Sequence, residues 1–358
     1  MRILFGSGEP YLPSFRGGAE CSVDELVRAL IAAGHVCEVV VGIRRGAARR
    51  RHRIWRFLSA KRSIARRDLR NGYPTHRAAP RAVVAALRER LAVFRPDLVI
   101  GWNRVSEQLA REAASVSIPS LVWVHDATLA WSRGRLPPEP TTRLAAVSEF
   151  LAGRVRERLG RSVAVLRPFI QLDDYRCEAR RPEFVTLVNP REAKGVEIAL
   201  AIAERLPARR FLFVGSQGLL ASERTALAAR VARLRNIRVE RHASDMRTVY
   251  ARTALLLVPS LCEDAAPRVI LEAHVNGIPV VASQVGGIPE VSGGAAVLLP
   301  ATAPPERWAA EVERLLDEPA WLAEVASRSR ANSARPELGS AAILESFLRL
   351  ANRHDPAD

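Results

Sequence analysis

The sequence predicts an α/β fold with two doubly wound, parallel-sheet domains, each of the nucleotide-binding type. Short apolar runs alternate with helical periodicities along the chain, which is typical of strand–helix–strand units. These runs lack polar alternation, as expected for strands that are buried on both faces. The length of 358 residues suits two domains, and the alternation restarts after a polar, proline-containing segment at residues 167–182.

The first domain is expected over residues 1–168. Its apolar residues recur with helical spacing from Val23 to Ile31, which predicts a helix that Gly34 ends. The strands predicted in this domain cover residues 3–5, 36–41, 98–100, 121–124, 144–147 and 163–166.

A second domain of the same kind is expected over residues 169–334. Its predicted strands cover residues 184–188, 211–214, 237–239, 255–258 and 279–282. The chain has helical character from Pro305 onward, and we expect residues 335–358 to form a C-terminal helix that packs back on the first domain.

Composition narrows the class of protein. Hydrophobic residues make up 48% and charged residues 26%, which is ordinary for a globular protein. The four cysteines are scattered without metal-ligand or redox spacing, so no zinc site and no disulfide framework is expected. The chain shows no secretory signal and no apolar run long enough to span a membrane, so we expect a cytoplasmic protein.

Most of the net charge of +16 comes from one segment, which carries +13. Between Arg44 and Arg81 the chain has 14 basic residues and one acidic residue. Within it, Ile54, Phe57, Leu58 and Ala65 fit one helical face. A basic amphipathic helix is typical of contact with an anionic membrane surface. A solvated arginine-rich insertion explains the same pattern, and both interpretations stay open. No nucleic-acid recognition module accompanies the charge, so no nucleic-acid partner is expected.

Two glycine-rich turns are candidate anion sites. Gly17 and Gly18 precede the first predicted helix, where backbone N–H groups can approach an anion closely. Gly286 and Gly287 follow a predicted strand and precede a helix start at Ile288. A plain turn before a helix is the alternative for the first of them. The earlier Gly6-Ser7-Gly8 lacks the third glycine of a dinucleotide fingerprint, which weakens a hydride-transfer function.

Lys194 is a candidate phosphate ligand. It lies in the loop after the first strand of the second domain, where open α/β sheets bind ligands. The chain has only two lysines, Lys61 and Lys194, beside 52 arginines. A lysine kept at this loop indicates a compact charge for a phosphate oxygen, although one of two lysines can also fall there by chance.

Three carboxylates and one histidine complete the candidate set. Glu263 and Asp264 follow a predicted strand, and Glu272 stands among apolar helix residues eight positions after Asp264. A carboxylate in that setting needs a partner, which a ribose diol or a salt bridge to Arg268 would provide. His125 ends a buried strand at the ligand edge of the first sheet, where a catalytic role and a structural one are both open.

Taken together, these stretches resemble glycosyltransferase family 4, whose members are retaining enzymes of the GT-B fold. The similarity runs in order from Gly17-Gly18-Ala19-Glu20 through Val147-Ser148-Glu149-Phe150 to Gly287-Ile288-Pro289-Glu290, and covers roughly residues 1–330. The resemblance implies a nucleoside-diphosphate sugar as donor substrate, no cofactor and no metal. It also implies a glycan, lipid-linked or small-molecule acceptor bound by the first domain.

The resemblance also implies roles for single residues. The diphosphate would be neutralised by Lys194 and Arg191, the ribose held by Glu272, and the donor sugar met by Asp264 or its neighbour Glu263. His125 would lie beside the reacting sugar. The residues assigned to catalysis are His125, Asp264 and Lys194, and those assigned to substrate binding are Gly17, Gly18, Arg191, Lys194, Glu263, Asp264, Arg268, Glu272, Gly286, Gly287 and Ile288.

Three departures from the family pattern bear on these roles. Asp264 stands where the family has a glutamate, Arg191 lies closer to Lys194 than the usual arginine, and Gln171 replaces a frequent aspartate. Two other functions remain open at this stage: a sugar-nucleotide 2-epimerase of the same architecture, and a non-catalytic nucleotide-sugar-binding protein.

Overall fold

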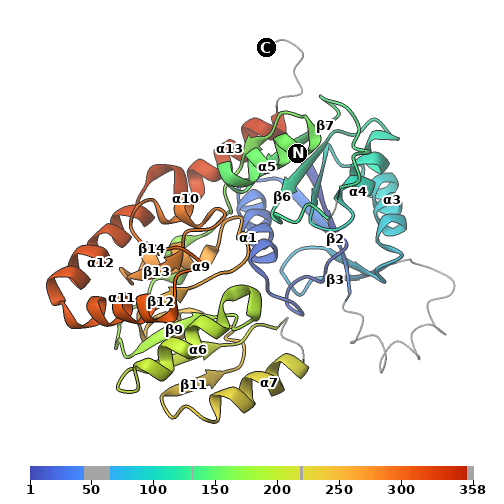
Figure 1. Ribbon diagram of the computed structural model, residues 1–358. Helices are drawn as coiled ribbons and strands as arrows, with labels where there is room; N and C mark the ends of the chain where they lie inside the picture. Colours follow the sequence, from blue (N-terminus) through green and yellow to red (C-terminus); the bar gives the residue numbers. More distant parts are fainter. Residues whose placement is uncertain (44–64, 131, 218–220, 353–358) are drawn as a thin grey trace. The chain divides into compact units, whose positions relative to one another are not determined.

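The computed structural model describes residues 1–43, 65–130, 132–217 and 221–352 (Figure 1). It divides into two compact units. The first unit comprises Met1–Phe169 with Ile343–Asp358, and the second comprises Ile170–Ala342. Each unit holds one β-sheet of its own.

The first unit contains an eight-stranded sheet in the order β3-β4-β2-β1-β5-β6-β7-β8. Neighbouring strands are parallel except for the edge pair β3 and β4, which is antiparallel. The strands are β1 (Arg2–Ser7), β2 (Val36–Gly42), β3 (Ala65–Asp68), β4 (Thr75–Ala78), β5 (Leu98–Trp102), β6 (Ser120–Val124), β7 (Thr142–Ala146) and β8 (Ala164–Val165).

Helices cover this sheet: α1 (Gly18–Ala32), α3 (Val83–Phe94), α4 (Ser106–Ala114), α5 (Glu149–Leu159) and most of α13 (Ser340–Asn352). The boundaries of α5 follow from its sequence. Ser148 caps the start by accepting a hydrogen bond from the backbone N–H of Leu151, and Gly160 ends the helix with a φ of 61°. Helix α13 is tied to β7, because an Arg143 guanidinium nitrogen donates to the Leu350 carbonyl at 2.7 Å.

The second unit contains a six-stranded sheet in the order β11-β10-β9-β12-β13-β14, with every neighbouring pair parallel. Its strands are β9 (Phe184–Val188), β10 (Arg210–Val214), β11 (Ile237–Glu240), β12 (Thr253–Val258), β13 (Val280–Ser283) and β14 (Val297–Leu299). Its α-helices are α6 (Val196–Arg205), α7 (Ala221–Val231), α8 (Arg247–Tyr250), α9 (Arg268–His274), α10 (Ile288–Ser292), α11 (Pro305–Asp317) and α12 (Pro319–Ser333). Short 3-10 turns are η1 (Leu172–Tyr175), η2 (Glu192–Lys194) and η3 (Pro336–Leu338).

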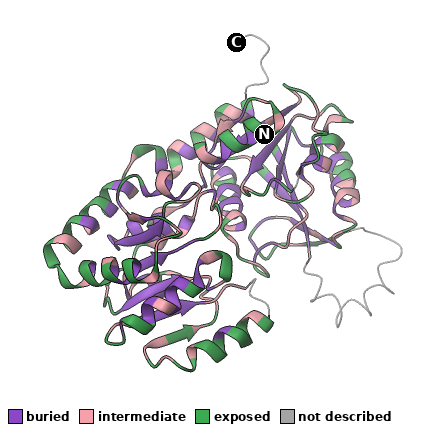
Figure 2. Cartoon of the chain, viewed as in Figure 1, coloured by how far each residue is buried: buried purple, intermediate pink, exposed green. Residues whose placement is uncertain are grey.

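An apolar core lies on each face of the second sheet. One core joins strand residues such as Leu187 and Leu257 to α6 and α11, and the other joins Leu256 and Val280 to α9 and α10. The inner strands are accordingly buried along most of their length in both units, whereas β3, β8, β11 and β14 are only partly buried (Figure 2). Burial on both faces explains why these strands read as continuous apolar runs in the sequence.

The predicted α/β fold class is confirmed, and each strand predicted from an apolar run is present. Strands β3, β4 and β14 were not predicted. Ala65 lies in β3, so the part of the predicted amphipathic helix that included this residue is wrong; antiparallel pairing with β4 holds it extended instead. The rest of that prediction, at residues 44–64 with Ile54 and Phe57, lies outside the described residues.

Candidate active site

In each sheet the strand order reverses at one point, and such a point is where open α/β sheets bind ligands. In the second unit the chain passes from β9 outward through β10 and β11, then returns to the other side of β9 with β12, β13 and β14. The switch point therefore lies between β9 and β12. In open α/β sheets, ligands bind beyond the carboxyl ends of the strands at this point. In the first unit, the corresponding point lies between β1 and β5.

Lys194 lies at the switch point of the second unit, in the loop that follows β9. The loop forms the short turn η2, in which the Lys194 N–H donates to the Arg191 carbonyl at 2.9 Å. Gly195 then turns the chain into α6 with a φ of 72°. A Cβ at Gly195 would come 1.9 Å from the Pro259 carbonyl oxygen, so the backbone of the β9 loop packs directly on the backbone that follows β12.

Asp264, in the loop after β12, is the ionic partner of Lys194. The Lys194 ammonium donates to Asp264 Oδ1, and the Ser260 hydroxyl donates to Asp264 Oδ2 at 2.7 Å. The Lys194 side chain is 28% exposed and that of Asp264 15% exposed. This ion pair brings together two residues that sequence analysis assigned to catalysis.

The backbone of Asp264 connects this loop to a third loop, which follows β13. The Gly287 N–H donates to the Asp264 carbonyl at 2.7 Å, and the Ile288 N–H donates to Val285 at 3.2 Å. A Cβ at Gly286 would come 2.5 Å from the same Asp264 carbonyl oxygen, and Gly286 has a φ of 58°. The double glycine thus allows close packing of two loops, and the N–H groups of Gly287 and Ile288 donate inside the protein.

Glu272 is buried on α9 and is bonded from two directions. Arg268, one turn earlier, donates from Nε to Glu272 Oε1 at 3.2 Å, and the Tyr250 hydroxyl donates to Oε2 at 2.7 Å. Burial and the Glu272 carboxylate raise the pKa of Tyr250, so its hydroxyl stays protonated as a donor. The salt bridge to Arg268, one of the two partners considered from the sequence, is therefore present.

The other predicted site residues of the second unit differ in their burial and in their contacts. Glu263 is exposed beside Asp264, whereas the side chain of Ile288 is fully buried in the core under α10. Arg191 forms an ion pair with Glu223 of α7, at 3.4 Å. The Ile288 side chain is therefore part of the core, and only its backbone can belong to the candidate site.

In the first unit, Gly17 and Gly18 begin α1, and Glu20 lies in the first turn of the helix. Glu20 is only 4% exposed, and a Cβ at Gly17 would come 2.2 Å from its Oε2, so the carboxyl group fills the space beside the glycine. Asn103, which follows β5, lies with its Nδ2 3.5 Å from Glu20 Oε1. Burial raises the pKa of Glu20 to about 7. Sequence analysis did not single out this residue, although it belongs to the Gly17-Gly18-Ala19-Glu20 motif.

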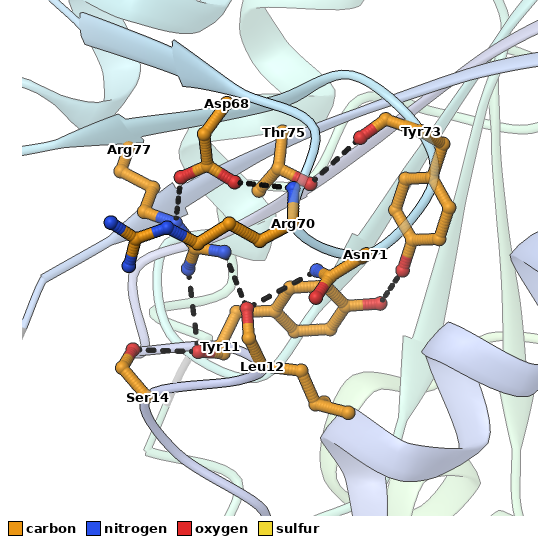
Figure 3. Close-up of polar contacts among 9 residues, drawn as sticks. All are labelled: Tyr11, Leu12, Ser14, Asp68, Arg70, Asn71, Tyr73, Thr75 and Arg77. Atoms are coloured by element: carbon orange, nitrogen blue, oxygen red, sulfur yellow. Dashed lines mark hydrogen bonds and ion pairs between the residues drawn. The ribbon is translucent and has the colours of Figure 1, made fainter.

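A buried polar cluster fixes the loop between β1 and α1 (Figure 3). The hydroxyls of Tyr11 and Tyr73 lie 2.8 Å apart, and Tyr73 donates to Asp24 of α1. Asn71 donates to the Leu12 carbonyl at 3.1 Å. These contacts tie the loop to the β3–β4 connection and to α1, so the segment that leads to Gly17 is held on two sides.

Arg77 of β4 strengthens this attachment. Its guanidinium donates to the Tyr11 and Leu12 carbonyls, and its Nε lies 2.7 Å from an Asp68 carboxylate oxygen (Figure 3). The side chains of Arg77 and Asp68 are both nearly buried. An ion pair shielded from water in this way is screened less than an exposed pair, so it holds the loop more strongly.

His125 directly follows β6, as predicted, and is half-buried. Its ring lies 4.4 Å from the Trp123 ring between centroids. The loop after it is anchored by Glu107 at the start of α4, which accepts hydrogen bonds from the Ser132 hydroxyl at 3.2 Å and the Arg133 N–H at 2.6 Å. Glu107 and Ser260 both support predicted residues, and neither has a local sequence signal that would have identified it.

Groups of metal ligands and membrane-spanning helices are both absent from the described residues. No group of three or more His, Cys, Asp or Glu side chains there could hold a metal ion. None of the helices in the described part of the chain combines the length and apolar character that crossing a bilayer requires.

Comparison with known proteins decides the family. The sequence profile described as Glycosyltransferase Family 4 matches residues 16–174, and the one described as Glycosyl transferases group 1 matches residues 181–318. Two D-inositol 3-phosphate glycosyltransferases are similar, at 34% identity over 166 residues for that of Segniliparus rotundus and 30% over 214 residues for that of Nocardiopsis dassonvillei. The chain belongs to glycosyltransferase family 4.

The matched regions of these two relatives are partial. They cover 42% of this family 4 glycosyltransferase and 35% of the Segniliparus protein, and 51% and 50% in the Nocardiopsis case. The chain thus matches half or less of the length of either curated relative. Among solved structures, Anabaena Alr3699/HepE in complex with UDP-glucose has a TM-score of 0.76 over 98% of both chains at 18% identity. This likeness confirms the GT-B fold.

Proposed function

We propose that this family 4 glycosyltransferase transfers a sugar from a nucleoside-diphosphate sugar to a hydroxyl acceptor, with retention of the anomeric configuration. The acceptor would be a glycan, a lipid-linked sugar or a small molecule. The observation that carries the proposal is the position of Lys194. Its ammonium lies at the switch point of the second sheet, where it donates to Asp264, whose carboxylate also accepts from the Ser260 hydroxyl.

The chemistry of the reaction matches this arrangement. Departure of a nucleoside diphosphate leaves negative charge on the phosphate oxygens, and a fixed cation stabilises that charge without needing to move a proton. In the proposal, Lys194 binds the diphosphate, Glu272 accepts from the ribose hydroxyls, and the leaving phosphate takes the acceptor proton. Neither a metal nor a covalent nucleophile is required for these steps.

In the proposal the first unit binds the acceptor, and Gly17 and Gly18 are its candidate site for the phosphate charge. Gly17 and Gly18 begin α1, whose N-terminus favours a negative charge. His125 would contact the reacting sugar from the loop that Glu107 anchors. The UDP-glucose bound to Alr3699/HepE supports the class of donor. The named activity of the two curated relatives supports transfer to an acceptor over epimerisation.

A ligand screen tests the proposed donor. Ligands that bind the folded state raise its thermal midpoint, so UDP-, GDP-, ADP- and TDP-sugars are compared at equal concentration. At least one of them should raise the midpoint of the parent protein. Lys194→Ala should reduce that shift strongly, because the cation at the phosphate is lost.

Arg205→Ala is the matched control, since Arg205 is a cation of the same unit that pairs with Glu306 on the surface. It should leave the ligand-induced shift intact. If Lys194→Ala and Arg205→Ala respond alike to every nucleotide sugar, the assigned pocket is wrong. Incubation of the parent with donor alone checks the remaining alternative, since an epimerised donor would contradict transfer.

A further inference from the structure

Asp264 has a carboxylate that is held at both oxygens by its own unit. Lys194 donates to Oδ1, from a loop 70 residues earlier in the chain, and Ser260 donates to Oδ2 at 2.7 Å. Both side chains of the ion pair are more than two-thirds buried. Exposed ion pairs add little to stability. This pair is partly buried and its carboxylate also accepts from a hydroxyl, so its geometry is held more firmly than that of a surface pair.

The backbone around Asp264 is fixed as firmly as its side chain. Its N–H donates to the Cys262 carbonyl at 2.8 Å, and its own carbonyl accepts from Gly287 at 2.7 Å. On the other side, the Leu261 N–H donates to the Ala193 carbonyl, next to Lys194, at 3.0 Å. The loops after β9, β12 and β13 therefore form one connected structure, and the Lys194–Asp264 pair lies within it.

We propose that Asp264 is a resident counterion, which holds the Lys194 ammonium in the donor-binding position and releases it to a phosphate oxygen when the donor binds. The inference rests on the proposed function of Lys194. In this inference, donor binding exchanges the Asp264 carboxylate for a phosphate oxygen at the Lys194 ammonium. Asp264 therefore lowers the affinity for the donor, and it also keeps Lys194 in place. No covalent bond changes in this step.

The exchange has a consequence that simple charge repulsion does not share. If Asp264 opposes anion binding by occupying Lys194, its effect must disappear when Lys194 is absent. If Asp264 only repels the diphosphate through space, its effect must persist. A double-mutant cycle on these two residues separates the two cases.

Binding of inorganic pyrophosphate, measured by isothermal titration calorimetry at fixed ionic strength, is the direct test. Asp264→Asn should bind pyrophosphate about tenfold more tightly than the parent, which equals about 1.4 kcal/mol. In the Lys194→Ala background, the same substitution should change affinity by less than about twofold. Glu192→Gln is the matched control: it removes one carboxylate from the exposed part of the Lys194 loop and should also change affinity by less than about twofold.

The outcomes distinguish the inference from the function on which it rests. If Asp264→Asn tightens binding equally with and without Lys194, or fails to tighten it, the counterion role is wrong while the Lys194 site stands. If Lys194→Ala binds pyrophosphate and nucleotide sugars like the parent, the proposed site itself is wrong.

A second measurement needs no variant of Asp264. The chain has only two lysines, so selective lysine labelling gives two side-chain NMR signals, and Lys61→Arg assigns them. Pyrophosphate should shift the Lys194 ammonium signal as its partner changes from carboxylate to phosphate. A Lys194 signal that does not move while calorimetry records binding would overturn the exchange.

Discussion

Arg268 and Glu272 form a buried ion pair one helical turn apart on α9, with Arg268 Nε 3.2 Å from Glu272 Oε1. Each partner has a further bond: Arg268 donates to the Tyr175 hydroxyl at 2.7 Å, and Tyr250 donates to Glu272 at 2.7 Å. The carboxylate assigned to the donor ribose is thus also part of a structural network. Its substitution should therefore affect both stability and nucleotide binding.

Glu272→Ala should lower the free energy of unfolding by about 3 kcal/mol, because it leaves the Arg268 charge buried without its carboxylate. Nucleotide affinity should fall as well. Urea unfolding and nucleotide titration measure the two effects. Glu318→Ala is the control, since Arg314 and Glu318 have the same spacing on the surface, and its cost should stay below about 1 kcal/mol. Equal losses for the two variants, or unchanged nucleotide affinity in Glu272→Ala, would refute the dual role.

Gly195→Ala should destabilise the second unit by about 2 kcal/mol and weaken donor binding. The substitution combines a left-handed φ of 72° with a Cβ that would come 1.9 Å from the Pro259 carbonyl, so the Lys194 loop must move. Gly153→Ala in α5 is the opposite case, because nothing lies within 4 Å of the added Cβ and helix propensity should stabilise it by about 0.5–1 kcal/mol. Denaturant midpoints of both variants test this. A Gly195→Ala protein as stable as the parent would show that the loop contact is not tight.

How far the sequence predicts this fold depends on how local each signal is. Strands such as β9 and β12 are continuous apolar runs between turn residues. A strand that is buried on both faces can be predicted from such a run alone. Strand β3 was missed because Arg66 and Arg67 give it no apolar pattern, and only antiparallel pairing with β4 makes it a strand. That pairing depends on tertiary context rather than on local preference.

The candidate site shows the same limit. Lys194 and Asp264 could each be selected by loop position and residue type, yet their ion pair joins residues 70 positions apart and depends on which strands are neighbours. The Arg268–Glu272 pair was foreseeable because helical spacing is local. The Tyr250 hydroxyl on Glu272 was not, since nothing near Tyr250 in the sequence marks it as a partner.

Glu20 makes the stability of the first unit depend on pH near neutrality. Burial, with a smaller contribution from the charge of nearby Glu9, raises the pKa of this carboxyl from its ordinary value of 4.5 to about 7. Glu9 itself pairs with Arg104 at 3.1 Å. The folded state therefore binds the proton more tightly than the unfolded state. The stabilisation of the folded state by the Glu20 proton is complete below about pH 4.5 and is lost as the pH rises towards about 7. Its total is on the order of 3 kcal/mol.

Glu20→Gln should remove this dependence, because the amide is neutral at every pH and has nearly the same shape. Unfolding free energies of the parent and the variant, measured from pH 4.5 to pH 8, should be similar at the acid end and diverge as the pH rises, with the variant more stable above pH 7. Glu25→Gln, on the partly exposed side of the same helix, controls for loss of a carboxylate from α1 and should show no such divergence. A constant difference between parent and Glu20→Gln across this range would mean that Glu20 titrates alike in the folded and unfolded states.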